Sequence, residues 1–362
     1  MKVGTCESKP GEITEGMLTL ATLQRGESVQ IPVKIAQGLK EGKTIFISSG
    51  IHGDELNGIE LNRRFYRYFL EHQHVKDLAG TIVFLPILNP SGFFVHERFV
   101  SFDGKDLNRC FNTAEEKTIS NQMADTLMTE VIAQCDYGLD LHDSGTRNVL
   151  LPHCRVHKEK LTGCTVEIGS LFGLDLITER IGQDGMMAVE AHNKFDIPIV
   201  TVEVGGGGIL WNTFLDRAVV GIKNILTHFD FLPGKIILPE KQFVIDLSGR
   251  EGYHAEMPGM VDIKVHLGEA VEKDALLARI YNPLNGEERE IHAKECGVVF
   301  SRRMKANVQL DDPIVIILGF EEASNKACRL SSKTARVIIN TETEAIQVIE
   351  SEVFLKALGL RV

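Results

Sequence analysis

Short apolar runs alternate with longer segments of helical periodicity through about residue 230. Four runs, rich in β-branched or aromatic residues, are predicted to be buried strands: Thr44–Ser48, Thr81–Leu85, Tyr137–Leu141 and Pro198–Val204. Within 115–135 and 209–229, apolar residues recur at the spacing of an amphipathic helix. Strands that alternate with helices indicate an α/β domain with a mainly parallel sheet, which binds ligands beyond the carboxyl ends of its strands.

The pattern changes after Leu232-Pro-Gly234, and short strands with turn residues dominate from about 238 to 320. A weak internal repeat links four pairs of residues that are 37 or 38 positions apart: Gly259 and Gly297, Val271 and Val308, Asp274 and Asp311, Ile280 and Ile317. Two copies of one β motif predict a compact, pseudo-symmetric β unit. It resembles the biotinyl/lipoyl barrel-sandwich fold, but the stretch Tyr281–His292, where a carrier domain has its modified lysine, contains no lysine. A structural or site-covering role is therefore favoured over a carrier function.

These patterns divide the chain into an α/β domain over 1–235, a β-rich domain over 236–325 and a tail over 326–362. The tail contains a predicted strand at Ala335–Ile339 and a predicted short helix at Ser351–Leu358, and its packing is not predicted. The length of 362 residues agrees with roughly two to two and a half domains.

Composition narrows the class of protein. Hydrophobic residues make up 43% and charged residues 25%, which is typical of globular chains and excludes disorder and coiled coils. The 39 Lys and Arg against 50 Asp and Glu give a formal charge of −11, which disfavours a nucleic-acid partner. No apolar run approaches the roughly 20 residues that cross a bilayer, so no membrane contact is expected.

The cysteines and the first residues predict a cytoplasmic location. The seven cysteines are scattered, odd in number and without a C-x-x-C pair, which favours reduced thiols over a disulfide framework. The residues after Met1 contain no apolar stretch of the kind found in secretory signals. The sequence leaves a homo-oligomer open.

Three predicted strands end in residues that could bind a metal or move a proton. His52 and Glu55 follow the first strand and are three positions apart, and His142 ends the third strand. Nitrogen and oxygen donors suit Zn²⁺ or a similar divalent ion, and three protein ligands leave one position open, as a catalytic zinc site requires. Either Asp140 or Asp143 could orient an imidazole from the second shell. The alternative for His52 and Glu55 is a surface histidine with a glutamate that the helix dipole favours at the start of a helix, and the alternative for His142 is a strand-end histidine bonded to the backbone.

Glu203 ends the fourth predicted strand, between valines and before four glycines. A carboxylate in such apolar surroundings is costly unless it is used, so we predict that Glu203 is a general base. The alternative is a buried ion pair. The loop arginines add anion-binding groups: Arg109 has a planar fork that matches a carboxylate, Asn108 adds an amide, and Arg98 could face a developing oxyanion.

These motifs together resemble the succinylglutamate desuccinylase/aspartoacylase family, a branch of the zinc carboxypeptidase-like fold. Five motifs occur in the family's order between about residues 40 and 230: His52-x-x-Glu55, Asn89-Pro90, Asp106-Leu-Asn108-Arg109, Asp140-Leu-His142 and Glu203. The resemblance implies a mixed, mainly parallel sheet flanked by helices in a zinc-dependent catalytic domain, with a C-terminal β domain over the site.

The resemblance also implies roles for individual residues. One Zn²⁺ would be held by His52, Glu55 and His142, and Glu203 would be the base. Asn108 and Arg109 would hold the carboxylate of a small N-acyl amino acid. Arg98 would polarise the carbonyl, although its distance along the chain from Asn108 is longer than in the family pattern. The family's substrate-contacting tyrosine has no clear counterpart here, and Tyr253 is only a position to test.

The implied activity is hydrolysis of the amide bond of an N-acyl amino acid by water that Glu203 activates. The closest enzyme alternative is a metallocarboxypeptidase that acts on peptides, because the ligand spacing and the Asn-Arg pair are shared. A non-catalytic binder on the same fold is a second alternative. The sequence does not encode the acyl group or the amino acid in a readable form.

Overall fold

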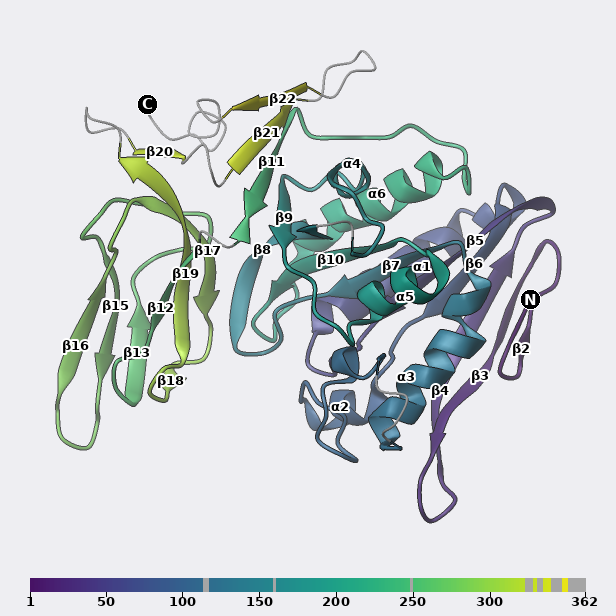
Figure 1. Cartoon of the computed structure of the whole chain (residues 1–362), viewed down its shortest axis with the longest axis horizontal. Helices are drawn as coiled ribbons and strands as arrows, with labels where there is room; N and C mark the ends of the chain where they lie inside the picture. The colour runs from purple at the N-terminus through teal and green to yellow at the C-terminus, as the bar shows by residue number, and fades with distance from the viewer. Residues whose placement is uncertain are drawn as a thin grey trace.

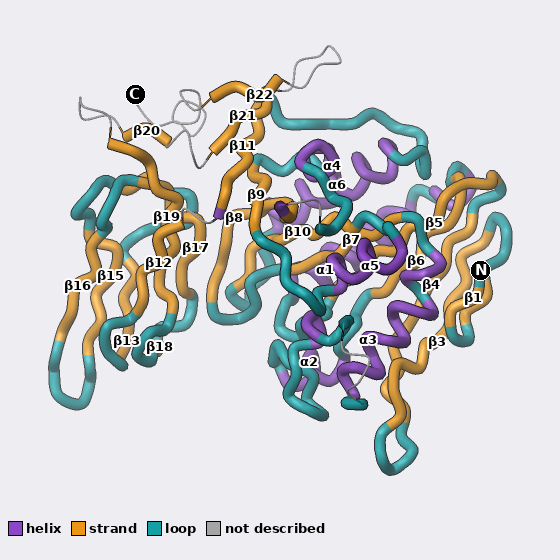
Figure 2. Tube along the Cα trace, viewed as in Figure 1, coloured by secondary structure: helices purple, strands orange, loops and turns teal. Residues whose placement is uncertain are grey.

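The computed structural model describes residues 1–112, 117–158, 161–247 and 250–322, and three further strands, β20 (Cys328–Leu330), β21 (Ala335–Ile339) and β22 (Gln347–Glu350). Helices gather around a long twisted sheet, and a group of strands without helices lies beside it (Figure 1). Figure 2 shows the same division by colour, with all the purple helices in the larger part. The smaller part corresponds to the β-rich segment predicted from the sequence.

The central sheet has the strand order β22-β21-β11-β9-β8-β10-β7-β5-β6-β4-β3. Its strands from the first 246 residues are β3 (Glu12–Thr22), β4 (Ser28–Gln37), β5 (Lys40–Ser49), β6 (Ala79–Leu85), β7 (Tyr137–His142), β8 (Asn148–His157), β9 (Leu176–Arg180), β10 (Ile199–Gly206) and β11 (Lys241–Asp246). The neighbours β10, β7, β5 and β6 are parallel, and they contain the four predicted strands. The predicted strands and the mainly parallel sheet are therefore confirmed. A separate small sheet pairs β1 (Lys2–Val3) with β2 (Cys6–Glu7).

Helices cover both faces of this sheet. One face packs against α1 (Leu56–Glu71), α4 (Val166–Leu171) and α6 (Asn212–His228). The other face packs against α3 (Ile119–Glu130) and α5 (Met187–Phe195). The connections contain the short 3-10 helices η1 (His74–Lys76), η2 (Leu107–Arg109) and η3 (Ile132–Gln134) and the short helix α2 (Pro90–Val95).

The two predicted helices have different outcomes. The helix predicted over 209–229 is α6. The helix predicted over 115–135 is too long, because α3 ends at Glu130 and η3 follows it. The chain leaves the helix there to enter β7, and the Asp136 carboxylate accepts a hydrogen bond from the Thr44 backbone at 2.8 Å beside that entry. Residues 115 and 116 of the prediction lie outside the described residues.

Gly58 lets α1 approach β7 closely. A Cβ atom at this position would lie 2.3 Å from the carbonyl oxygen of Leu141, so the helix would have to move away from the sheet. Alanine normally favours a helix over glycine by about 1 kcal/mol, yet we expect Gly58→Ala to lower the free energy of unfolding by about 2 kcal/mol because of this overlap. Denaturant unfolding measures the change, and an unchanged or higher midpoint would contradict the close contact.

The β-rich part contains the internal repeat. Its strands are β12 (Arg250–His254), β13 (Gly259–Ile263), β14 (Ala270–Val271), β15 (Leu276–Tyr281), β16 (Glu288–His292), β17 (Gly297–Arg303), β18 (Asn307–Val308) and β19 (Pro313–Glu322). Val271 and Val308 each end a two-residue strand, and Asp274 and Asp311 both have positive φ, 64° and 66°. Corresponding positions in the two copies of the repeat therefore have the same backbone conformation, which confirms the two copies of one β motif.

The central sheet takes in strands from all three predicted segments of the chain. β11 and β21, which follow residue 235, pair with each other, and β11 also pairs with β9. The β-rich part joins the sheet through β17, which pairs antiparallel with β8. The predicted strand in the tail is β21, whereas the predicted helix Ser351–Leu358 lies outside the described residues.

Two further expectations concern the environment of the chain. No helix in the part of the chain that the structure describes has the length and hydropathy to cross a membrane, and the expected cytoplasmic location stays a prediction. Five cysteines are free thiols (Cys6, Cys110, Cys135, Cys154 and Cys164), but Cys296 is disulfide-bonded. The expectation of reduced thiols throughout is therefore wrong at Cys296.

Candidate active site

Three neighbouring strands bring the candidate residues to one edge of the sheet. His52 follows β5, His142 is the last residue of β7, and Glu203 is directly opposite His142 on the parallel strand β10. The buried Asn62 of α1 supports this edge, because its side-chain amide donates to the carbonyl oxygens of Ile47 and Leu85 at 3.1 and 3.2 Å. The carboxyl ends of the parallel strands therefore form the site, as expected for this class of sheet.

His52, Glu55 and His142 form a buried cluster whose potential ligand atoms all lie within 4.8 Å of one another. The Nδ1 atom of His52 lies 2.6 Å from one carboxylate oxygen of Glu55, and the Nδ1 atom of His142 lies 2.8 Å from the other. Both imidazoles thus turn the same ring nitrogen toward the same carboxylate. The structure brings together the three residues that the sequence predicts to hold a metal.

A second carboxylate holds the far side of each imidazole. The Nε2 atom of His142 lies 2.6 Å from Asp140, and the Nε2 atom of His52 lies 3.0 Å from Asp106. Ser48 in turn donates a hydrogen bond to Asp140 at 2.9 Å. Such outer carboxylates fix the orientation of metal-binding histidines. Asp106 in this position was not foreseen from the sequence.

Asp143, the other candidate for this orienting position, has a different place. Its carboxylate accepts hydrogen bonds from the backbone and side-chain amides of Asn57 and from the backbone of Gly145. Burial, with a smaller contribution from the charge of Glu55, raises the pKa of Asp143 to about 8. Asp143 therefore anchors the start of α1, and Asp140 alone orients His142.

The electrostatics of the cluster favour a cation. Burial opposes ionisation of Glu55, but the two neighbouring imidazoles hold its pKa well below the usual range of a carboxyl. Burial would also lower the pKa of His142, but Asp140 and Glu55 outweigh it and raise that pKa to about 10. Three carboxylates, those of Glu55, Asp106 and Asp140, thus surround two imidazoles; all of these groups are buried except that of Asp106, which is partly exposed. This donor set and its negative charge fit a divalent ion of the zinc type.

A cavity of about 230 Å³ opens beside the cluster. It is lined by the predicted site residues and by further polar groups, in total His52, Glu55, Arg98, Asn108, Arg109, His142, Asp143, Ser144, Leu150, Arg155, Arg180 and Glu203. Four of its lining residues are arginines, although the whole chain is acidic. The wall of this cavity is therefore rich in cationic side chains.

Arg98 reaches the edge of the cluster. It donates to Asp106 at 2.8 and 3.1 Å and lies 3.5 Å from Glu55, and its side chain is 39% exposed. Arg98 therefore connects the cavity wall to the carboxylate that orients His52.

Asn108 and Arg109 belong to η2, which begins after Asp106 caps the turn by accepting from the Asn108 backbone at 2.9 Å. The side-chain oxygen of Asn108 accepts from the backbone of Met187 at 2.9 Å, which fixes the amide between η2 and α5. Arg109 donates to the Asn108 carbonyl oxygen at 2.6 Å. Among the described residues no carboxylate pairs with Arg109, so its guanidinium is free to bind an anion in the cavity.

Glu203 forms an ion pair with Arg155 on the neighbouring strand β8, and both side chains are largely buried. The β8–β10 ladder is interrupted after Glu203, and the four glycines that follow all have positive φ. A Cβ on Gly205 would lie 2.6 Å from Trp211, and one on Gly206 would lie 2.4 Å from Ser144. The glycines thus permit this turn and its tight packing.

Sequence reasoning missed Arg155 and Arg180, and it suggested Tyr253. Arg155 and Arg180 lie on β8 and β9, two strands that were not predicted. Tyr253 is buried in β12, where its hydroxyl accepts from the Lys294 backbone at 2.8 Å, and it does not line the cavity. Tyr253 is therefore wrong as a candidate for substrate contact.

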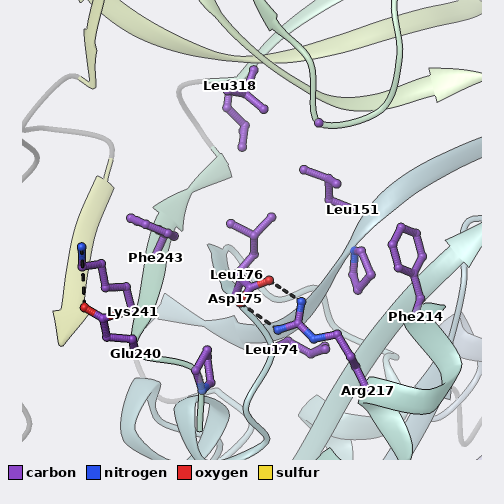
Figure 3. Close-up of a pocket in the computed structure, with 14 residues that line it drawn as sticks. Leu151, Leu174, Asp175, Leu176, Phe214, Arg217, Glu240, Lys241, Phe243 and Leu318 are labelled. Atoms are coloured by element: carbon purple, nitrogen blue, oxygen red, sulfur yellow. Dashed lines mark hydrogen bonds and ion pairs between the residues drawn. The ribbon is translucent and has the colours of Figure 1, made fainter. Parts of the chain in front are cut away.

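A second cavity, of about 540 Å³, differs in chemistry from the site. Its walls are mostly apolar, with Leu176, Phe243 and Leu318 among them (Figure 3). Its arginine, Arg217, points at Asp175 and is neutralised by it at 2.5 and 2.8 Å. No metal-binding cluster lines it among the described residues, so it does not compete with the cavity at Glu203 as the reaction site.

Residues 41–229 match the model of the succinylglutamate desuccinylase/aspartoacylase catalytic domain. The chain is 27% identical to the N-alpha-acetyl-L-2,4-diaminobutyric acid deacetylase of Halomonas elongata over 307 aligned residues. The alignment covers 82% of this chain and 87% of that protein. Two solved structures share the fold. A succinylglutamate desuccinylase from a Silicibacter species has a TM-score of 0.75 at 24% identity, over 88% of this chain and 99% of that one.

The second is the product-bound ectoine utilization protein EutE (DoeB) from Ruegeria pomeroyi, with a TM-score of 0.73 at 22% identity, over 84% of this chain and 94% of that one. These likenesses confirm the predicted zinc carboxypeptidase-like fold. The catalytic-domain match covers more than half of the chain and includes every residue of the buried cluster and its cavity. The chain therefore belongs to the succinylglutamate desuccinylase/aspartoacylase family.

Proposed function

We propose that the protein is a zinc-dependent hydrolase that cleaves the amide bond of a small N-acyl amino acid. The observation that carries the proposal is the convergence of His52, Glu55 and His142 beside a small cavity that also contains Glu203 and the unneutralised Arg109. The family and the deacetylase relative support an amidohydrolase on this site.

One Zn²⁺ would be held by the Nδ1 atoms of the two histidines and by the carboxylate of Glu55. The geometry that supports this is the paired Nδ1 contacts with Glu55, at 2.6 and 2.8 Å, with both Nε2 atoms already engaged by Asp106 and Asp140. A zinc ion in such a site lowers the pKa of a water to about 7 and polarises the carbonyl of the scissile amide.

The protein's own residues would supply proton transfer and binding. Glu203 takes a proton from the attacking water and later delivers it to the leaving amine. Arg98, at the rim of the cluster, faces the carbonyl oxygen as negative charge develops on it. Asn108 and Arg109 hold the carboxylate of the substrate, which fixes the amide bond above Glu203.

The size of the cavity favours a small substrate over a peptide. A volume of about 230 Å³ matches a single N-acyl amino acid and falls below the usual range of sites for larger ligands. The relative from Halomonas elongata acts on N-alpha-acetyl-L-2,4-diaminobutyric acid by its name, which is a molecule of this size. A metallocarboxypeptidase would need room for the peptide on the acyl side.

A substrate panel on zinc-loaded protein tests the proposal. The panel contains N-acetyl and N-succinyl derivatives of acidic, basic and apolar amino acids, each also as the carboxamide, together with dipeptides and tripeptides that have a free carboxyl end. We expect release of free amino acid from one or more of the N-acyl acids and little from their carboxamides. Cleavage of the peptides alone would favour the carboxypeptidase instead, and the absence of turnover on every compound would favour a non-catalytic binder.

Arg109→Met is expected to raise KM about 100-fold and to leave kcat within threefold. A charged hydrogen-bond pair with the substrate carboxylate contributes about 2–3 kcal/mol to binding, and the same contact is made before and during the reaction. Steady-state kinetics measures both constants. Arg217→Met is the matched control, because it removes an arginine from the apolar cavity and is expected to change neither constant. A loss confined to kcat would contradict a binding role for Arg109.

A further inference from the structure

Arg155 is a cavity residue that forms an ion pair with Glu203, and nothing in the family motifs of the sequence points to it. It lies on β8 opposite Thr201 of β10, two positions from the partner of Glu203, so the two side chains share one face of the sheet. Their ion pair is largely shielded from water, with 12% of the Arg155 side chain and 5% of the Glu203 side chain exposed. Among the described residues Glu203 makes no other ion pair or side-chain hydrogen bond.

The surroundings of Arg155 are not those of a structural arginine. Arg303, a buried arginine at the end of β17, satisfies its donors with the carbonyl oxygens of Lys305, Pro313 and Asn307 and with Asp312. The Nε atom of Arg155 is buried without any hydrogen-bond partner. An unmade hydrogen bond of this kind costs stability, so burial of Arg155 is not explained by stabilisation of the fold.

Neighbouring groups do not fix Arg155 either. His157, two positions along β8, has two buried ring nitrogens without partners, and Thr178, opposite Arg155 on β9, has an unpartnered hydroxyl. Burial and the charge of Arg180 lower the pKa of Arg155 to about 9, so it stays a cation at neutral pH. Among the described residues, Glu203 is therefore the only ion-pair partner of Arg155, and Arg155 is the only ion-pair partner of Glu203.

The backbone beside Glu203 also gives the carboxylate little support. The β8–β10 ladder is interrupted between Glu203 and Gly205, and glycines with positive φ follow. A general base must lie within hydrogen-bond reach of the water that it deprotonates, and a shift of about 1 Å costs on the order of 10²-fold in rate. A side-chain contact must therefore supply the orientation that the strand does not.

We infer that Arg155 is the positioning residue of Glu203. Its guanidinium holds the Oε1 atom of the carboxylate from the β8 side and leaves Oε2 for the attacking water. Arg98 cannot replace it, because Asp106 engages Arg98 through two donors. The inference rests on the proposed function of Glu203. It means that a residue of β8 orients the general base.

Kinetics of Arg155→Met tests the inference with the fastest N-acyl amino acid of the panel. We expect kcat to fall about 100-fold with KM within threefold and with unchanged metal content. Arg155→Lys should recover at least tenfold of that loss, because it restores the cation. Arg217→Met, which breaks the more exposed pair with Asp175 outside this cavity, should match the wild type. A rise in KM with unchanged kcat, or wild-type kinetics, would overturn the inference.

A double-mutant cycle separates positioning from a structural effect. In a Glu203→Gln background, Arg155→Met should cause no further loss of rate, since Arg155 acts through Glu203. A further 100-fold loss would mean that Arg155 acts independently. If Arg155→Met does not fold, Arg155→Gln takes its place in the same cycle. Wild-type protein without turnover would instead refute the proposed function, whereas an active wild type with an equally active Arg155→Met refutes only this inference.

Discussion

Glu203→Gln is expected to lower kcat by about 10³-fold while metal content and melting temperature stay close to those of the wild type. The amide has nearly the shape of the carboxylate and keeps a contact with Arg155, but it cannot accept the proton of the attacking water. General acid–base groups typically contribute 10²- to 10⁴-fold to a rate. Glu203 is not part of the cluster formed by His52, Glu55 and His142, so metal binding should not depend on it.

Discontinuous or continuous assays of amide cleavage give kcat, and metal analysis of the same sample gives the metal content, so together they test this prediction. Glu203→Asp is the second variant, because it keeps the carboxylate but shortens the side chain by one methylene group, which moves the carboxylate away from the attacking water. We expect it to lie between the wild type and Glu203→Gln. Normal turnover by Glu203→Gln would show that another group accepts the proton, and Asp143 would then be the next carboxylate in the cavity to examine.

The sequence predicted those parts of the site that follow buried parallel strands. The second half of β5, most of β7 and the first half of β10 are short apolar runs, and His52, His142 and Glu203 stand out because they are polar residues at or just after the ends of such runs. The carboxyl ends of parallel strands meet at one edge, so strand assignment alone was enough to group these residues. The order of the family motifs added Asn108 and Arg109, which lie on a 3-10 turn with no periodicity of its own.

Arg155 and Arg180 could not be found in this way. β8 contains a proline and polar residues among its apolar ones, because one of its faces borders the cavity and its far end pairs with β17. That mixture hides the period of two by which a half-buried strand is recognised. Arg155 also meets Glu203 only because β8 lies between β10 and β9, antiparallel to β10 and parallel to β9, a topology that the separate runs do not specify.

In the β-rich part, the sequence predicted the internal repeat but not how this part joins the central sheet. Its repeat was visible in the sequence because Asp274 and Asp311 occupy turns with the same positive φ, and such turns restrict the choice of residue. Its attachment was not visible, since the pairing of β17 with β8 depends on register between segments about 150 residues apart. Tyr253 was named as a position to test for a similar reason: the sequence does not specify the direction in which its hydroxyl points.

His142→Ala is expected to abolish tight zinc binding and, with it, activity. The change removes one of the three proposed ligands, so that only His52 and Glu55 of this cluster remain to hold the ion. Loss of an outer carboxylate already costs 10- to 100-fold in metal affinity, so loss of a ligand should cost more than about 100-fold. Metal analysis of protein purified without chelators, followed by competition with a zinc chelator, gives the occupancy and the affinity.

Two variants make this experiment specific to the cluster. His153→Ala removes a histidine that is equally buried and lies opposite Glu203 on β8, but whose Nδ1 binds the Leu151 carbonyl oxygen at 2.9 Å, so zinc binding should match the wild type. Asp140→Asn weakens the hold on His142 Nε2 and should lower zinc affinity only 10- to 100-fold. The expected order of affinity is therefore His153→Ala, then Asp140→Asn, then His142→Ala. Full zinc occupancy in His142→Ala would contradict the ligand set, since His52 and Glu55 would then have to hold the ion with a partner outside this cluster.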